Sequence, residues 1–187
     1  MKTDFEVKAE AIARKLPRAY MEDRFTEIEQ DLRELKQLAV TVDEKFSVQG
    51  KLASHYAFQQ DWPKTEAALR ERAELDSARV EGWLGLAEHF HYYNEDLQLA
   101  STYVEKALTT AVEANELVRQ VLGVRIRISL ASGNYSIVEQ SLLMLLEYRS
   151  PPGGFDVALE SDFVSLIPVD AVDPEIIERY EALIAGG

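Results

Sequence analysis

Apolar residues recur along the first part of the chain at the spacing of amphipathic helices. One series predicts a short helix that stops at Pro17: Phe5, Ala9, Ile12 and Leu16. A second series advances in steps of three and four with charged residues between them: Phe25, Ile28, Leu32, Leu35, Ala39 and Val42. Residues 1–45 are therefore expected to form N-terminal helices. A coiled coil is the alternative for the second series, but its seam is shorter than the about three to four heptads that such a structure needs.

The next stretch repeats itself with a shift of 34 residues. The aligned pairs are Leu52 with Leu86, Ala53 with Ala87, His55 with His89, Tyr56 with Phe90, Phe58 with Tyr92, Leu69 with Tyr103 and Ala73 with Ala107. Gln60-Asp61 and Asn94-Glu95 are aligned as turns. In the first copy, Asp61-Trp62-Pro63 begins a second helix, because aspartate caps a helix and proline fits its first turn. Each copy is thus predicted to be a helix pair.

A third helix pair follows with a weaker match. Its apolar positions are Leu122, Ile126 and Leu130, and then Ile137, Val138, Leu142, Leu145 and Leu146. Gly133-Asn134-Tyr135 is its predicted turn, and this turn comes later than the period requires. An insertion of about one helical turn is therefore expected near Val112 to Leu117.

The chain after the third pair predicts a break and then a cap. Ser150-Pro151-Pro152-Gly153-Gly154 cannot continue a helix. The following residues are too apolar for a free tail and should lie on the helical array: Phe155, Val157, Leu159, Phe163, Val164, Leu166 and Ile167. Asp173-Pro174-Glu175 begins a last amphipathic helix. We expect this helix to cap the array, because a terminal repeat otherwise exposes its apolar side.

Composition narrows the range of functions. The chain has 187 residues, 47% of them hydrophobic, which is enough for one sizeable core and predicts a single domain over 1–187. With 20 Lys and Arg against 33 Asp and Glu, the net charge is −13, which disfavours nucleic acid and anionic membranes as partners. The absence of cysteine excludes disulfides, thiolate catalysis and cysteine-held zinc.

The sequence shows no signal for export or membrane insertion. Its N-terminus is acidic and amphipathic, without the apolar stretch of a signal peptide. No run approaches the about 20 apolar residues that cross a bilayer. A cytoplasmic location is therefore expected.

The second copy reads Trp83-x-x-Leu86-Ala87-x-x-Phe90, which resembles the W-x₂-L-G-x₂-Y signature of tetratricopeptide repeat (TPR) proteins. The period of that family is also 34 residues, and its unit is a helix, a turn and a helix. The resemblance covers residues 46–151. It implies an all-α, TPR-like helical-repeat array, a right-handed superhelix of antiparallel helix pairs, with residues 152–187 as a C-terminal extension and capping helix.

In that family, the first helices of the pairs line a concave groove that binds a peptide or helix of a partner. The residues that the register places on the groove are Ser54, Phe58, Glu81, Leu84, Glu88, His91, Tyr92 and Arg127. Members that clamp carboxylates use Asn where this chain has Ser54 and Glu88, so no such clamp is expected. Glu81 and Glu88 beside the aromatic residues instead favour a basic or apolar partner segment.

Aromatic residues at the signature positions are most simply explained as core: Tyr56, Trp62, Trp83 and Phe90. Three further aromatics fit either the core or a binding surface: Phe58, Tyr92 and Tyr93. Glu88-x-x-His91 has the spacing found in di-iron helix bundles, but such bundles need a second Glu-x-x-His, which this sequence lacks. No metal or cofactor is therefore expected.

These observations predict a non-catalytic protein–protein interaction adaptor. A narrower alternative is a chaperone similar to the small acidic three-repeat chaperones of bacterial secretion systems, which would form a homodimer through the N-terminal helices, residues 5–42. The rival class is a helical-bundle metal enzyme in which Glu88 and His91 act as ligands or acid–base groups.

Overall fold

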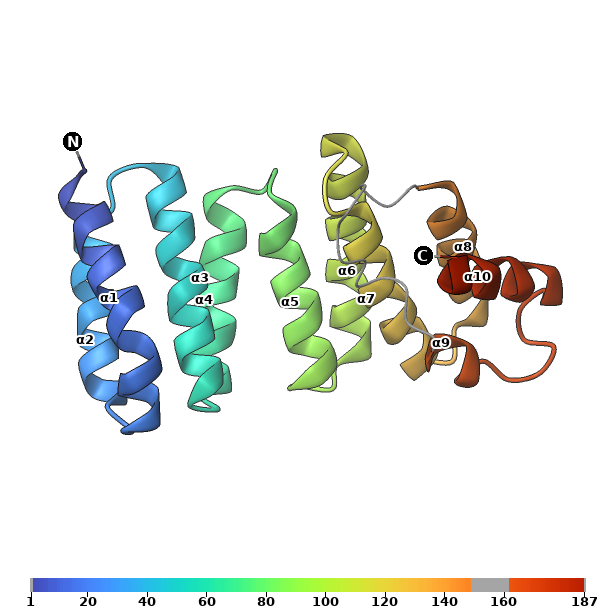
Figure 1. Ribbon diagram of the computed structural model, residues 1–187, viewed down its shortest axis with the longest axis horizontal. Helices are drawn as coiled ribbons and strands as arrows, with labels where there is room; N and C mark the ends of the chain where they lie inside the picture. The colour runs from blue at the N-terminus through green and yellow to red at the C-terminus, as the bar shows by residue number, and fades with distance from the viewer. Residues whose placement is uncertain (1, 149–161, 187) are drawn as a thin grey trace. The chain divides into compact units, whose positions relative to one another are not determined.

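The computed structural model of the protein describes residues 2–148 and 162–186. Within those residues, all regular secondary structure is helical, which confirms the all-α prediction (Figure 1). The helices are α1 (Asp4–Met21), α2 (Phe25–Leu38), α3 (Val42–Phe58), α4 (Trp62–Leu75), α5 (Val80–Tyr92), α6 (Leu97–Ala114), α7 (Val118–Ala131), α8 (Tyr135–Glu147), α9 (Asp162–Ser165) and α10 (Pro174–Gly186). The predicted break at 150–154 and the apolar residues 155–161 lie outside the described residues.

Local sequence sets where the helices begin. Thr3 and Thr41 each form a capping box, with Glu6 and Glu44 respectively, so that side chains satisfy the first free backbone amides of α1 and α3. The turns inside the helix pairs share one design, a residue with positive φ followed by a residue of capping type. These residues are Gln60 and Asp61, Glu95 and Asp96, and Gly133 and Asn134.

The described chain divides into two compact units, one up to Ser77 and one from Ala78 onward. In the first unit, successive helices pack antiparallel from α1 to α4. In the second unit, α5 pairs with α6 and α7 pairs with α8, while α7 also packs on α6 and α5. The buried centres of the two units are apolar: Ile12, Ile28, Leu32, Leu35 and Leu52 in the first, and Leu86, Phe90, Leu122, Ile126 and Leu142 in the second.

The 34-residue register places equivalent residues in equivalent environments. Leu52 and Leu86 are both buried on the first helix of a pair, and His55 and His89 are also both buried. The following turn is one residue longer in the second pair. The backbone amide of Asp61 donates a hydrogen bond to the Tyr56 carbonyl, five residues earlier, whereas the amide of Asp96 donates to the Phe90 carbonyl, six residues earlier. The structural partner of Gln60-Asp61 is therefore Glu95-Asp96, not Asn94-Glu95.

The predicted insertion is confirmed in α6, which has 18 residues where α4 has 14. The extra turn ends at Asn115 and Leu117, which both adopt left-handed backbone conformations. The predicted cap is confirmed as well. Helix α10 packs on α8 through the buried residues Ile176 and Tyr180.

Two helix boundaries differ from the prediction. Helix α1 continues through Pro17 to Met21, although proline inside a helix costs about 3 kcal/mol. Pro17 itself is exposed, and the turn after it buries Ala19 in the first unit, which offsets part of that cost. The second difference is that α2 ends at Leu38. Thr41 then caps a new helix, so Val42 begins α3 and is exposed.

The predicted core aromatics divide into two classes. Tyr56 and Phe90 are buried, whereas Trp62 and Trp83 are only half-buried. Trp83 stacks on Tyr103 with ring centroids 6.2 Å apart, and the Lys106 ammonium lies 4.7 Å from the centre of the indole ring. The indole thus lies at the edge of the α5–α6 contact under a lysine side chain.

Candidate functional site

An open groove of about 560 Å³ lies in the first unit over α1, α2, α3 and α4. We call it the first-unit groove. It is lined by Leu16, Tyr20, Leu32, Ser47, Gly50, Lys51, Ser54, Phe58 and Arg72. Five of these residues come from α3, the first helix of the first repeat pair.

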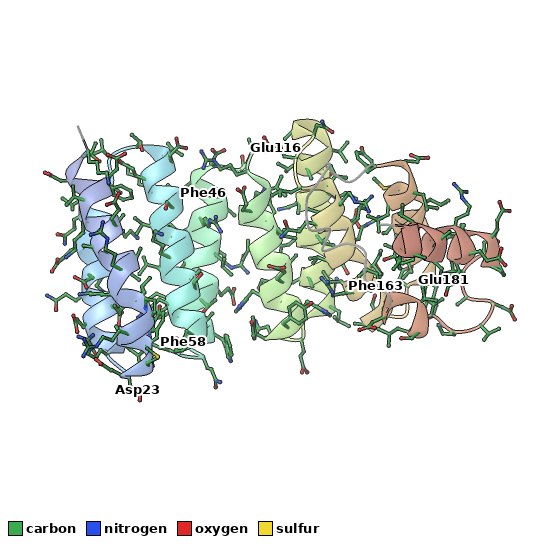
Figure 2. All side chains as sticks on the ribbon, viewed as in Figure 1. Asp23, Phe46, Phe58, Glu116, Phe163 and Glu181 are labelled. Carbon is green, nitrogen blue, oxygen red and sulfur yellow. The ribbon has the colours of Figure 1, made fainter. Side chains whose placement is uncertain are left out.

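One end of the first-unit groove is an aromatic platform. Phe58 is 58% exposed at the last turn of α3, beside the turn between α1 and α2 (Figure 2). Its ring stacks on Tyr20 with centroids 4.5 Å apart, and Phe25 lies 5.8 Å from it. The platform therefore presents a rigid aromatic surface to solvent.

The buried His55 contacts the hydroxyl group of Tyr20 and fixes its position. The His55 Nδ1 atom lies 3.1 Å from the Tyr20 hydroxyl, and the Gln59 amide nitrogen lies 2.7 Å from His55 Nε2. Burial lowers the pKa of His55, with the Lys64 charge acting in the same direction and Glu29 opposing it. A neutral ring then accepts from Gln59 through Nε2 and donates from Nδ1 to Tyr20.

The charged residues that line the first-unit groove are both cationic. The Arg72 guanidinium covers the Phe46 ring, with Cζ 4.2 Å from the ring centre, and it lies 3.1 Å from where a Cβ on Gly50 would be. Glycine therefore leaves the space that the guanidinium occupies. Lys51 is half-buried and forms no hydrogen bond or ion pair with any described residue.

A second cluster lies in the second unit, where α5 meets α7. Burial raises the pKa of the half-buried Glu88, and the Arg127 charge only partly offsets this rise. Burial also lowers the pKa of His91, and Arg127 lowers it further. These two shifts favour a neutral His91 and make ionised Glu88 energetically costly.

Arg127 also borders a pocket of about 410 Å³ in this unit. The pocket is lined by His91, Arg127, Leu130, Ala131, Asp162, Phe163 and Leu166. Phe163 is 2% exposed, and the Arg127 guanidinium carbon lies 5.5 Å from the centre of its ring. Asp162 and Phe163 of the short helix α9 thus line one side of the pocket, and Figure 2 labels Phe163.

The residues predicted to bind a partner have different places in the two units. Ser54 and Phe58 line the first-unit groove, although the Ser54 hydroxyl already donates to the Gly50 carbonyl. Glu88, His91 and Arg127 form the cluster of the second unit. Glu81 is exposed, Tyr92 is 49% exposed, and Leu84 is buried and offers little surface.

Sequence reasoning missed several residues of these surfaces. Lys51 could have been found, because Lys51, Ser54 and Phe58 follow steps of three and four on one helix face. Tyr20, Arg72 and Phe163 reach the surfaces from other helices, so no local pattern marks them. Within the described part of the chain, no group of three or more His, Cys, Asp and Glu side chains is arranged to hold a metal ion. No helix described is long and apolar enough to cross a membrane.

One known structure has a similar architecture. No family model matches the chain, and no curated protein matches it. A crystal structure from Podosopora anserina, of nearly identical TPR-like repeats in a protein described as a kinesin light chain, matches with a TM-score of 0.68. The match covers 100% of this chain and 98% of that chain at 14% sequence identity. The fold is a divergent TPR-like repeat. At this level of identity, the TPR-like likeness concerns the fold alone.

Proposed function

We propose that this protein is a non-catalytic interaction scaffold that holds a segment of a partner protein on the α5 surface of the second unit. The observation that carries the proposal is the Glu88–His91–Arg127 cluster beside two exposed tyrosines, Tyr92 and Tyr93. Helical-repeat folds offer extended surfaces of this kind to partners.

The aromatic residues supply the apolar part of the proposed contact. Tyr92 and Tyr93 are each 49% exposed at the end of α5, and the Tyr92 ring lies 4.4 Å from the His91 ring. Tyrosines are enriched among the residues that dominate protein interfaces, because they bury a large surface and lose little conformational entropy. A partner segment with an apolar side chain would cover these rings.

The charge of the proposed partner segment follows from α5. Glu81 and Glu88 lie two helical turns apart on the same helix, and Glu88 is ionised at a cost because burial raises its pKa. A cation from the partner would lower the pKa of Glu88 again and would pair with it in a partly dry environment. We therefore propose a basic segment with an apolar anchor.

Two peptides of matched length test this proposal by isothermal calorimetry. One carries lysines around a leucine, and the other carries glutamines in place of the lysines and should bind more weakly. Glu88→Lys is expected to weaken binding of the lysine peptide about tenfold or more, since reversal replaces an attraction with a repulsion. Tyr92→Ala is expected to weaken it because the apolar contact is lost.

The acidity of the whole chain requires a control, because lysine peptides are attracted to any surface of a protein with a net charge of −13. Glu113→Lys makes the same charge change at an exposed position of α6 in the same unit. It should leave the affinity within about twofold. An equal loss in Glu88→Lys and Glu113→Lys would mean general attraction and would refute the site.

A further inference from the structure

We propose that the first-unit groove is a second docking site, and that it takes an acidic segment with an apolar anchor, the opposite charge from the α5 surface. Its basis is a half-buried lysine without a carboxylate partner beside an exposed aromatic platform. The inference shares with the proposed function the premise that partner proteins bind, but it concerns other residues in the other unit.

The local charge of the groove is opposite to that of the chain. The protein has 33 acidic against 20 basic residues, yet the described residues that line this groove include Lys51 and Arg72 and none that is acidic. A concave surface focuses the field of its own charges. The groove is therefore a local cationic site within an acidic protein.

Lys51 differs from three lysines of the first unit that form ion pairs. Lys8 pairs with Asp31 and Glu34, Lys15 pairs with Glu27, and Lys36 pairs with Glu71. Lys51 has no such partner among the described residues, although acidic side chains are abundant. Its ammonium is thus available to a carboxylate that a ligand brings, and partial burial would strengthen that pairing.

The aromatic platform supplies the anchor point. Phe58 and Tyr20 are stacked with centroids 4.5 Å apart, and the hydrogen bonds of His55 fix Tyr20. Leu16 extends the apolar wall of the groove, and the buried Leu32 lies behind it. A large apolar side chain of a ligand can therefore pack on a surface that is already ordered, which keeps the entropic cost of binding low.

The distance between Lys51 and Phe58 determines how far apart the acidic and apolar residues of the ligand should be. Lys51 and Phe58 are seven residues apart on α3, which is about 10 Å along the helix axis. Three residues of an extended chain span about the same length. The expected ligand is thus an extended segment in which an Asp or Glu lies three positions from a Phe or Leu.

Three labelled peptides test this inference with the full chain by fluorescence anisotropy. The first carries Glu three positions from Phe in a Ser/Gly background, the second has Gln in place of Glu, and the third has Ala in place of Phe. The first is expected to bind about tenfold more tightly than either of the others. The net negative charge of this protein disfavours the glutamate peptide in general, so equal or tighter binding of the glutamine peptide would refute the proposal.

Matched variants locate the site. Lys51→Glu and Phe58→Ala should each weaken binding of the first peptide about tenfold, whereas Lys51→Arg should retain most of it. Lys45→Glu makes the same charge change at an exposed position of the same helix and should leave affinity within about twofold. Equal losses in Lys51→Glu and Lys45→Glu, or no binding of the first peptide at millimolar protein concentration, would overturn the inference.

Circular dichroism melts separate loss of the site from loss of the fold. Lys51→Gln is the variant to use if Lys51→Glu melts early. The outcome is also independent of the proposed function, because the Glu88 experiments use a lysine peptide and residues of α5. If the α5 experiments fail and the first-unit groove experiments succeed, the scaffold has the groove as its single binding surface. If the α5 experiments succeed and the groove experiments fail, the α5 surface is the single binding surface.

Discussion

His55 connects the exposed platform of the first unit to its buried interior. Its ring is fully buried, and both ring nitrogens have hydrogen-bond partners, Tyr20 and Gln59. The equivalent residue of the next repeat, His89, is also buried and contacts Phe90, with ring centroids 5.3 Å apart. Repeated histidines in this register thus act as packed polar residues of the helix pairs.

The lowered pKa of His55 predicts how stability depends on pH. Because the pKa in the folded state lies below the ordinary value of 6.5, the stabilisation from neutral His55 is fully present above that value. It is lost as pH falls below 6.5, since the unfolded chain then binds the proton more readily. The free energy of unfolding should therefore fall more for the parent protein than for His55→Gln between pH 7.5 and 5.5.

Urea unfolding of both proteins at the two pH values measures this effect. Other titrating groups, including His91, are present in both proteins and cancel in the difference. A difference in unfolding free energy that does not change with pH would show that His55 does not carry this linkage.

At the residue scale, the sequence predicts packing positions that recur in each repeat, but it does not predict which side chains from different helices meet in a groove. Leu52 and Leu86 could be aligned because the same packing position recurs in each pair. The charge of the first-unit groove could not be predicted in this way. Arg72 lines the groove from α4 and Tyr20 lines it from α1. The repeat register does not indicate that either side chain lies there.

At the scale of elements, hydrophobic periodicity and caps predict the helices well. One boundary differs because helix α1 continues past Pro17 and buries Ala19, and the other differs because Thr41 caps a new helix. Helix α9 shows a limit of another kind. It has four residues, too few for a periodic signal, and it is positioned by the burial of Phe163 against Arg127.

Two apolar residues at α9, Phe163 within the helix and Leu166 just after it, are expected to differ strongly in their effect on stability. Phe163 is 2% exposed, so Phe163→Ala should lower the free energy of unfolding by about 3 kcal/mol, the low end for core phenylalanines because a short helix can relax. Leu166 is 61% exposed, so Leu166→Ala should change it by less than about 0.5 kcal/mol. Chemical denaturation measures both. Similar small effects would mean that α9 does not form part of the folded core.

At the scale of the whole molecule, the described residues divide into two compact units between Ser77 and Ala78. The single domain expected from composition stays a prediction, because compact units can belong to one domain or to two. Composition does not reveal such a division, because each unit has its own apolar centre and the repeat register runs through the boundary. The division matters for function. Each proposed surface is built entirely from residues of one unit.

Two surfaces with separate residues and opposite charge predict a crossed pattern of variant effects. Lys51→Glu should weaken the acidic peptide about tenfold and leave the lysine peptide unchanged, while Glu88→Lys should do the reverse. In the double variant, each peptide should lose only the affinity that it loses in the single variant affecting it, because the sites share no residue. Both peptides should also bind more weakly at high salt, since ions screen each pairing. Anisotropy measurements with each peptide separately against the three variants decide the matter. If either single variant weakened both peptides by the same factor, the protein would have one shared surface and not two docking sites.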